Sequence, residues 1–129
     1  MIVVDTSALM AIVLGEPGGA ACIDILTAER DVAICAGTLA EVLIIAARRN
    51  VGAEVATLVE GLGFTVVALT EAGSRRAAEA YARWGRGVHP AGLNFGDCFA
   101  YALAKADDRP LLFVGEDFAR TDVRPARAG

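Results

Sequence analysis

The chain has 129 residues, enough for one domain with its own core, and 55% of them are hydrophobic while only 6% are aromatic. Its three cysteines are odd in number and lack CxxC spacing, which argues against a disulfide framework or thiolate zinc site and favours a reducing cytosol. The formal net charge of −4 disfavours a nucleic-acid partner at first sight, but the arginines are clustered, so global charge does not decide the question.

Short apolar strands alternate with helices along the chain. We expect strands at residues 2–4, 32–35, 64–69 and 111–114, with a weak fifth strand near Val123. We expect helices directly after Asp5 and at residues 20–29, 38–50, 52–61, 71–84 and 94–106, a long loop at 85–93, and a frayed tail at 125–129. This alternation predicts an α/β fold, a three-layer α/β/α sandwich with a mainly parallel central sheet, formed by a single domain over residues 1–129.

No basic leader precedes the first apolar stretch, and the longest uncharged apolar runs are too short to cross a bilayer. We therefore expect a soluble cytoplasmic protein with no membrane contact. The three cysteines are expected to be small buried side chains.

Four carboxylates lie in otherwise apolar stretches. Asp5, Glu41 and Asp97 are each the only charged residue in a window of at least fifteen positions, and Asp117 closely follows the last apolar run. A carboxylate in apolar surroundings is costly unless it is paired or holds a metal. No Lys or Arg lies close in sequence to the first three, so these positions require an explanation.

Each acid also has a structural interpretation as a helix cap. Asp5 can cap the first helix, Thr38 and Glu41 fit a capping box, and Asn94 and Asp97 fit a variant of it. The fourth acid can cap a last turn or stabilise a loop. Acids at helix N-termini are common and are favoured by the helix dipole, so capping alone explains each acid about as well as chemistry does.

Taken together, the four positions favour a shared site. Asp5 and Asp117 follow expected strands, Glu41 begins the helix after another strand, and Asp97 opens a helix after the long loop. In an open parallel sheet the active crevice lies beyond the carboxyl ends of the strands, so all four can point into it. Carboxylates without a His or Cys cluster suit Mg²⁺ or Mn²⁺, which can activate a water for attack on a phosphodiester.

The blocks around these acids resemble PIN-domain proteins. The opening residues MIVVDTSAL, Glu41 in its early helix, residues 91–102 (AGLNFGDCFAYA) and residues 111–122 (LLFVGEDFARTD) stand in the family's order and span essentially the whole chain. The last two blocks look like VapC-type toxins of type II toxin–antitoxin systems. The resemblance implies a PIN-like fold and a Mg²⁺-dependent endoribonuclease, usually a homodimer, that cleaves RNA and is held inactive by a cognate antitoxin.

The resemblance also implies roles for particular residues. It makes Asp5, Glu41, Asp97 and Asp117 the catalytic and metal-binding quartet, with support from Ser7, Asn94 and Thr121. An antitoxin that blocks such a crevice needs a cation among the acids, and an Arg suits this better than a Lys because its planar fork binds a carboxylate at two points. The chain departs from many relatives at Glu116, where they carry asparagine, and we expect Glu116 to lie on the surface.

Other residues admit a role in RNA binding. Arg83, Arg86 and His89 can contact RNA phosphates near the long loop, although a solvated helix end explains them equally well. Trp84 and Phe95 can stack on a base. For these two aromatic residues, packing in the core is the preferred interpretation.

Other functions were weighed against this one. A haloacid-dehalogenase-type phosphatase needs a second aspartate where this chain has Ser7, and a receiver domain needs paired N-terminal acids and a strand-end lysine. A catalytically silent PIN-fold binding module remains an alternative, which the intact set of acids disfavours. A housekeeping RNA-processing nuclease is the alternative within the same class, although such proteins usually carry extra domains.

Overall fold

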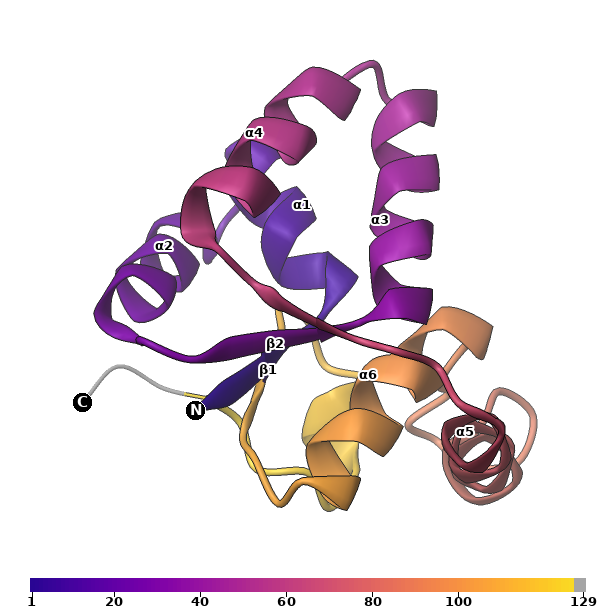
Figure 1. Cartoon of the computed structure of the whole chain (residues 1–129). Coiled ribbons are helices and arrows are strands. Elements are labelled where there is room, and N and C mark those ends of the chain that lie inside the picture. The colour runs from indigo at the N-terminus through magenta and orange to yellow at the C-terminus, as the bar shows by residue number, and fades with distance from the viewer. Residues whose placement is uncertain (127–129) are drawn as a thin grey trace.

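A small sheet of parallel strands lies at the centre of the computed structural model, which describes residues 1–126 (Figure 1). These residues form four strands: β1 (Ile2–Val4), β2 (Val32–Cys35), β3 (Thr65–Val67) and β4 (Leu111–Leu112). The strand order is β3-β2-β1-β4, and every pairing is parallel. β1 therefore lies between β2 and β4, and the carboxyl ends of all three strands meet at one edge of the sheet.

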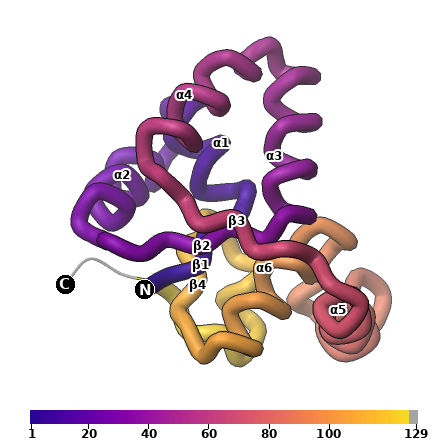
Figure 2. Tube along the Cα trace, viewed as in Figure 1, coloured from indigo at the N-terminus to yellow at the C-terminus, as the bar shows by residue number. Residues whose placement is uncertain are grey.

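Helices cover both faces of this sheet, as the alternating pattern predicts (Figure 1). The helices α1, α2, α3 and α4 lie on one face, and α5 and α6 lie on the other (Figure 2). Their bounds are α1 (Thr6–Leu14), α2 (Gly19–Ala28), α3 (Ala36–Arg48), α4 (Gly52–Leu62), α5 (Glu71–Trp84) and α6 (Phe95–Ala106), followed by a short 3₁₀ turn, η1 (Phe118–Arg120). The prediction of a three-layer α/β/α sandwich is confirmed.

Successive side chains of each strand are buried on opposite faces of the sheet, so the fold has two hydrophobic cores. Val3, Ala33 and Leu111 are buried against α5 and α6. Their neighbours along the strands, such as Val4 and Ile34, are buried against the four helices of the other face. Because successive side chains of a strand point to opposite faces, a strand buried on both sides must be apolar throughout, as these are.

Side-chain caps start several helices where the sequence predicts them. Asp5 Oδ2 accepts a hydrogen bond from the Ser7 backbone N–H (3.0 Å) and caps α1. Asn94 and Asp97 form a reciprocal capping box at the start of α6. At the other end of α1, Gly15 adopts a left-handed conformation with φ of 64°, which glycine adopts without steric cost.

Several predictions about local structure are wrong. The capping box of Thr38 and Glu41 does not form, because α3 begins at Ala36, earlier than expected, and the Thr38 hydroxyl has no partner among the described residues. β3 and β4 end sooner than predicted. Phe95, expected in the core, is 75% exposed, because it occupies the first position of α6 on the outer side of the helix. Trp84 and all three cysteines are buried as expected.

The segment after η1 is attached to the rest of the fold by side chains and backbone. Trp84 Nε1 donates to the Tyr101 hydroxyl (2.9 Å), which donates to Asp122 Oδ1 (2.5 Å). Instead of a fifth strand, a single parallel bridge joins Leu111 and Pro125. The predicted frayed tail is thus ordered at residues 125 and 126, while residues 127–129 lie outside the described part of the chain.

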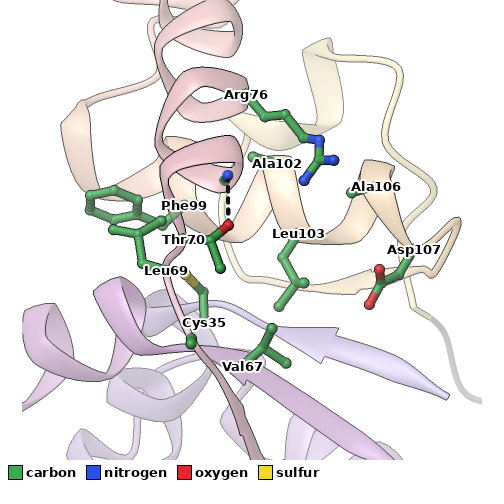
Figure 3. Close-up of a pocket in the computed structure, with 12 residues that line it drawn as sticks. Cys35, Val67, Leu69, Thr70, Arg76, Phe99, Ala102, Leu103, Ala106 and Asp107 are labelled. Carbon is green, nitrogen blue, oxygen red and sulfur yellow. Dashed lines mark hydrogen bonds between the residues drawn. The ribbon is translucent and has the colours of Figure 1, made fainter.

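A narrow pocket of about 160 Å³ lies between β3, α5 and α6 (Figure 3). Its wall includes Cys35, Leu69, Arg76, Phe99 and Asp107, and the Thr70 cap of α5 lies at its side. It contains none of the four isolated acids. Within residues 1–126 no single helix is long and apolar enough to cross a bilayer; α1 and α2 reach the required composition only as a pair bent by 116°.

Candidate active site

Asp5 leaves β1 at its carboxyl end and is almost completely buried, with 2% of its surface exposed. Its Oδ2 accepts hydrogen bonds from the backbone N–H and the hydroxyl of Ser7, at 3.0 and 2.7 Å. The Ser7 hydroxyl in turn accepts from the backbone N–H of Val114 (3.0 Å), just beyond β4. Oδ1 is buried and has no hydrogen-bond partner among the described residues. One oxygen of Asp5 is therefore fixed, and the burial of the other is not compensated by a hydrogen bond from any described residue.

Glu41 lies in α3 and reaches the starts of two other helices. The Thr6 hydroxyl, at the start of α1, donates to Glu41 Oε1 (2.6 Å). On its other side the carboxylate lies against the backbone of Gly96, in the first turn of α6. The carboxylate of Glu41 thus lies where α1 and α6 begin.

Asp97 and Asp117 complete the group. Asp97 Oδ2 accepts from the backbone N–H of Asn94 (2.9 Å), and the Asn94 side chain accepts from the backbone N–H of Asp97 (2.9 Å). Asp117 directly precedes η1, is exposed, and makes no side-chain cap. Its negative charge nevertheless acts on Asp97, so Asp117 lies at the exposed border of the group.

The acids influence one another's protonation. Burial raises the pKa of Asp5 to about 7, the charges of Asp97 and Glu41 contribute to the rise, and the Ser7 hydrogen bonds oppose it. Burial also raises the pKa of Asp97 to about 6, again with a contribution from Glu41. None of the four acids forms an ion pair within residues 1–126. The structure therefore brings the four predicted acids into one group of interacting charges.

This cluster fits an oxygen-bound divalent cation, although it is not a closed cage. No three acids among the described residues already stand in metal-binding geometry. Mg²⁺ does not require this, because it keeps several of its waters and binds through one or two carboxylates. The buried Oδ1 of Asp5, which has no partner among the described residues, would supply one such ligand, and Glu41 and Asp97 lie near enough to act on it electrostatically.

The predicted supporting residues fall into two groups. Ser7 and Asn94 hold carboxylate oxygens of Asp5 and Asp97 directly. Thr121 instead donates to the backbone carbonyl of Phe118 (2.7 Å) and accepts from the backbone N–H of Val123 (3.3 Å). Its hydrogen bonds thus shape the turn after η1 and include none of the four acids.

The residues proposed to contact RNA lie in different surroundings. Arg86 is close enough to Asp97 to lower the pKa of that carboxyl. The Arg83 guanidinium lies over the Trp84 ring (4.5 Å) and 3.7 Å from Asp122 Oδ2. His89 Nδ1 accepts from the backbone N–H of Ala91 (3.0 Å), and its ring packs edge-on against Trp84. Arg86 is the one of the three that acts on the acidic cluster.

Two residues of the cluster were not predicted from the sequence. Thr6 donates to Glu41, and Gly96 makes room for it. Signals for both exist in the sequence. Thr6 is a hydroxyl beside an isolated acid, and Gly96 is a glycine in the first turn of an expected helix, which often marks a close approach of another group.

Comparison with known proteins identifies the family. A family model described as "PIN domain" matches residues 2–124. The chain is 43% identical over 129 residues to "Ribonuclease VapC42" of Mycobacterium tuberculosis (strain ATCC 25618 / H37Rv), covering 96% of this chain and 98% of the relative.

Solved structures share the fold at low sequence identity. The crystal structure of Mycobacterium tuberculosis VapC20, described as a "Sarcin-Ricin loop cleaving toxin", has a TM-score of 0.79 at 17% identity and covers 99% of this chain and 100% of that one. A "Toxin-antitoxin complex from Klebsiella pneumoniae" has a TM-score of 0.70 at 18% identity, covering 95% and 93%. On the family match and the extent of its identity to curated relatives, the chain belongs to the PIN-domain family and, within it, to the VapC ribonucleases.

Proposed function

We propose that this protein is a Mg²⁺- or Mn²⁺-dependent endoribonuclease that hydrolyses RNA phosphodiester bonds in the cytoplasm and acts as the toxin of a toxin–antitoxin pair. The observation that carries the proposal is the cluster of four acids at the carboxyl edge of the sheet. Its most buried member, Asp5, has one oxygen without a hydrogen-bond partner in residues 1–126. The name of the 43% identical relative, "Ribonuclease VapC42", supports the same activity.

Some residues of the chain would bind such an ion directly, and others would orient those ligands. Asp5, Glu41 and Asp97 are the ligands we propose, with Asp117 at the exposed border. When bound, the ion would supply an activated water and would neutralise charge that develops on the phosphodiester. Hydrogen bonds from neighbouring residues already fix one oxygen of each of the three acids, and such supporting bonds commonly orient metal ligands.

Arg86 is the cation that we propose for positioning RNA. It acts on Asp97 through space but forms no ion pair with a described acid, so its guanidinium is available to a phosphate. Arg83 and His89 stay secondary candidates, because both are engaged with Trp84. Phosphate contacts of this kind set the position of the strand and carry little sequence information.

An apolar hollow borders the acids and suits a protein partner. Its lining includes Glu41 itself together with Ala40, Ile44, Phe95 and Phe99. Ile44 is 61% exposed and Phe95 75% exposed, which is unusual for side chains of this size. We propose that the C-terminal segment of the antitoxin lies in this hollow and inserts an Arg or Lys among the acids.

A second apolar hollow continues from Phe95 along α5. It is lined by Leu69, Ala77, Ala78, Tyr81, Phe95 and Phe99, among others. We propose that the chain forms a homodimer and buries this surface. Light scattering on the purified protein would then give the mass of two copies, and Tyr81→Glu would shift it towards one. A wild-type mass of one copy would contradict the dimer.

Removing single charges tests catalysis. Asp5→Asn, Glu41→Gln and Asp97→Asn should each lower RNA cleavage by at least about 100-fold with the fold intact, because each removes a ligand charge and little volume. Asp117→Asn should have a smaller effect, since it lies at the border. Glu116→Gln is the matched control and should cleave like the wild type. Cleavage of a fluorescent RNA, with circular dichroism to check folding, gives the answer. Wild-type activity in all three variants would contradict a catalytic role for these acids.

The protonation of the cluster predicts opposite pH trends with and without metal. Asp5 and Asp97 have folded-state pKa values of about 7 and 6, against 3.8 for a free aspartate, so between these values the folded state binds more protons than the unfolded state. In EDTA the melting temperature should therefore fall between pH 5 and pH 8, on the order of 5 °C, and Asp5→Asn should reduce that fall. Stabilisation by Mn²⁺ should grow over the same range, because binding needs deprotonated carboxylates.

Thermal unfolding at pH 5 and pH 8, with EDTA or with millimolar Mn²⁺, measures both trends. A melting temperature that does not respond to Mn²⁺ at pH 8 would count against the metal site.

A substitution in the hollow tests the antitoxin. When the chain is co-expressed with its antitoxin, Ile44→Glu should reduce the amount that copurifies, because a buried charge would replace apolar contact. Ile23→Glu is the control, since Ile23 is 42% exposed on α2 and lies outside the hollow. Changing the inserted Arg or Lys of the antitoxin to Ala should weaken inhibition of RNA cleavage. Equal copurification with both isoleucine variants would contradict this docking surface.

A further inference from the structure

Gly96 and the Glu41 carboxylate occupy adjoining space. A methyl group built at Gly96 would overlap Oε2 and Cδ of Glu41 and would lie 2.7 Å from Oε1. Gly96 is buried and is the second residue of α6, where any residue can adopt the backbone conformation. No unusual backbone angle requires glycine here, so the feature that distinguishes this position is the acid lying against it.

Glu41 is also held from the opposite side. The Thr6 hydroxyl donates to Oε1 at 2.6 Å, and Thr6 is itself buried at the start of α1. The carboxylate is thereby confined between the first turns of α1 and α6. Because Asp97 directly follows Gly96, the depth to which Glu41 enters this space sets how near it comes to Asp97.

The ends of α3 and α6 approach closely at a second point. A methyl group at Gly37, in the first turn of α3, would lie 2.8 Å from two ring carbons of Phe99. Phe99 belongs to α6, one turn beyond Gly96. Two glycines, one on each helix, thus permit the same close approach, and Gly96 is the one that faces an acid.

We propose that Gly96 is a positioning residue of the active site: its missing side chain leaves the space that the Glu41 carboxylate fills, and so fixes that acid beside Asp97. This inference rests on the proposed function for its catalytic meaning. Its structural content, a coupling between Gly96 and Glu41, can be measured without metal or RNA.

A double-mutant cycle measures that coupling. The wild type, Gly96→Ala, Glu41→Ala and the double variant are unfolded thermally in EDTA. In the Glu41→Ala background, Gly96→Ala should raise the melting temperature by roughly 2–5 °C, because alanine favours a helix and the space is empty. In the wild-type background the rise should be smaller by at least about 2 °C or should become a fall, because the carboxylate must move and lose its Thr6 hydrogen bond. Equal changes in both backgrounds would overturn the inference.

The second measurement concerns the site. Because Glu41 ends in a flexible side chain, Gly96→Ala should leave the protein folded, yet the Mg²⁺ concentration for half-maximal RNA cleavage should rise by roughly 10-fold or more. Gly61→Ala is the matched control. This glycine lies in α4 with no atom within 4 Å of an added methyl group, so its variant should keep the wild-type Mg²⁺ response. An unchanged Mg²⁺ response in Gly96→Ala would also overturn the inference.

The two measurements separate the inference from the proposed function. A wild-type protein that shows no metal-dependent cleavage would refute the proposed function. The double-mutant cycle would still decide whether Gly96 positions Glu41.

Discussion

The burial of Asp5 is the constraint on which the rest of this structure depends. A carboxylate with 2% of its surface exposed and no cationic partner among the described residues is destabilising in its charged form. Ser7 stabilises this buried acid. Its hydroxyl donates to one carboxylate oxygen and also accepts a hydrogen bond from the backbone beyond β4. The strand β1, the start of α1 and the end of β4 are therefore joined at one charged group. Relocating this acid would require rebuilding the centre of the sheet.

Capping and chemistry are compatible at this site. Asp97 accepts a backbone hydrogen bond within the capping box of α6, and its pKa is raised by burial and by the charges of Glu41 and Asp117. Asp5 likewise caps α1 with one oxygen, while the other has no partner in the part of the chain that the structure describes. A cap holds a carboxylate still, and a fixed carboxylate is what an ion-binding site needs. The structural and functional interpretations of these residues therefore describe the same geometry.

Much of this arrangement can be predicted from residue patterns. Apolar strands between helices indicate the parallel layers, and isolated acids after strands indicate the site, because the carboxyl ends of parallel strands meet at one edge. Other features depend on contacts between distant segments. The hydrogen bond from Thr6 to Glu41 joins residues 35 positions apart, so the position of this hydroxyl beside Asp5 does not indicate that it binds Glu41. Phe95 has the composition of a core residue, yet its helix turns it outward. The expected Thr38 cap does not form, because α3 already begins at Ala36. Its N-cap residue is Cys35, whose side chain makes no capping hydrogen bond.

The position of β4 beside β1 has a consequence for biosynthesis. Asp5 and Asp117 are far apart in the sequence, and β1 acquires its β4 neighbour only once residues 111 and 112 have been made. A nascent or prematurely terminated chain that lacks this last segment contains Asp5 without the backbone beyond β4 that supports it through Ser7. The four acids can therefore come together only after Asp117 has been synthesised, and a fragment released before that point lacks the complete set. This chain order confines the complete cluster to molecules in which residues 111–117 have already been made.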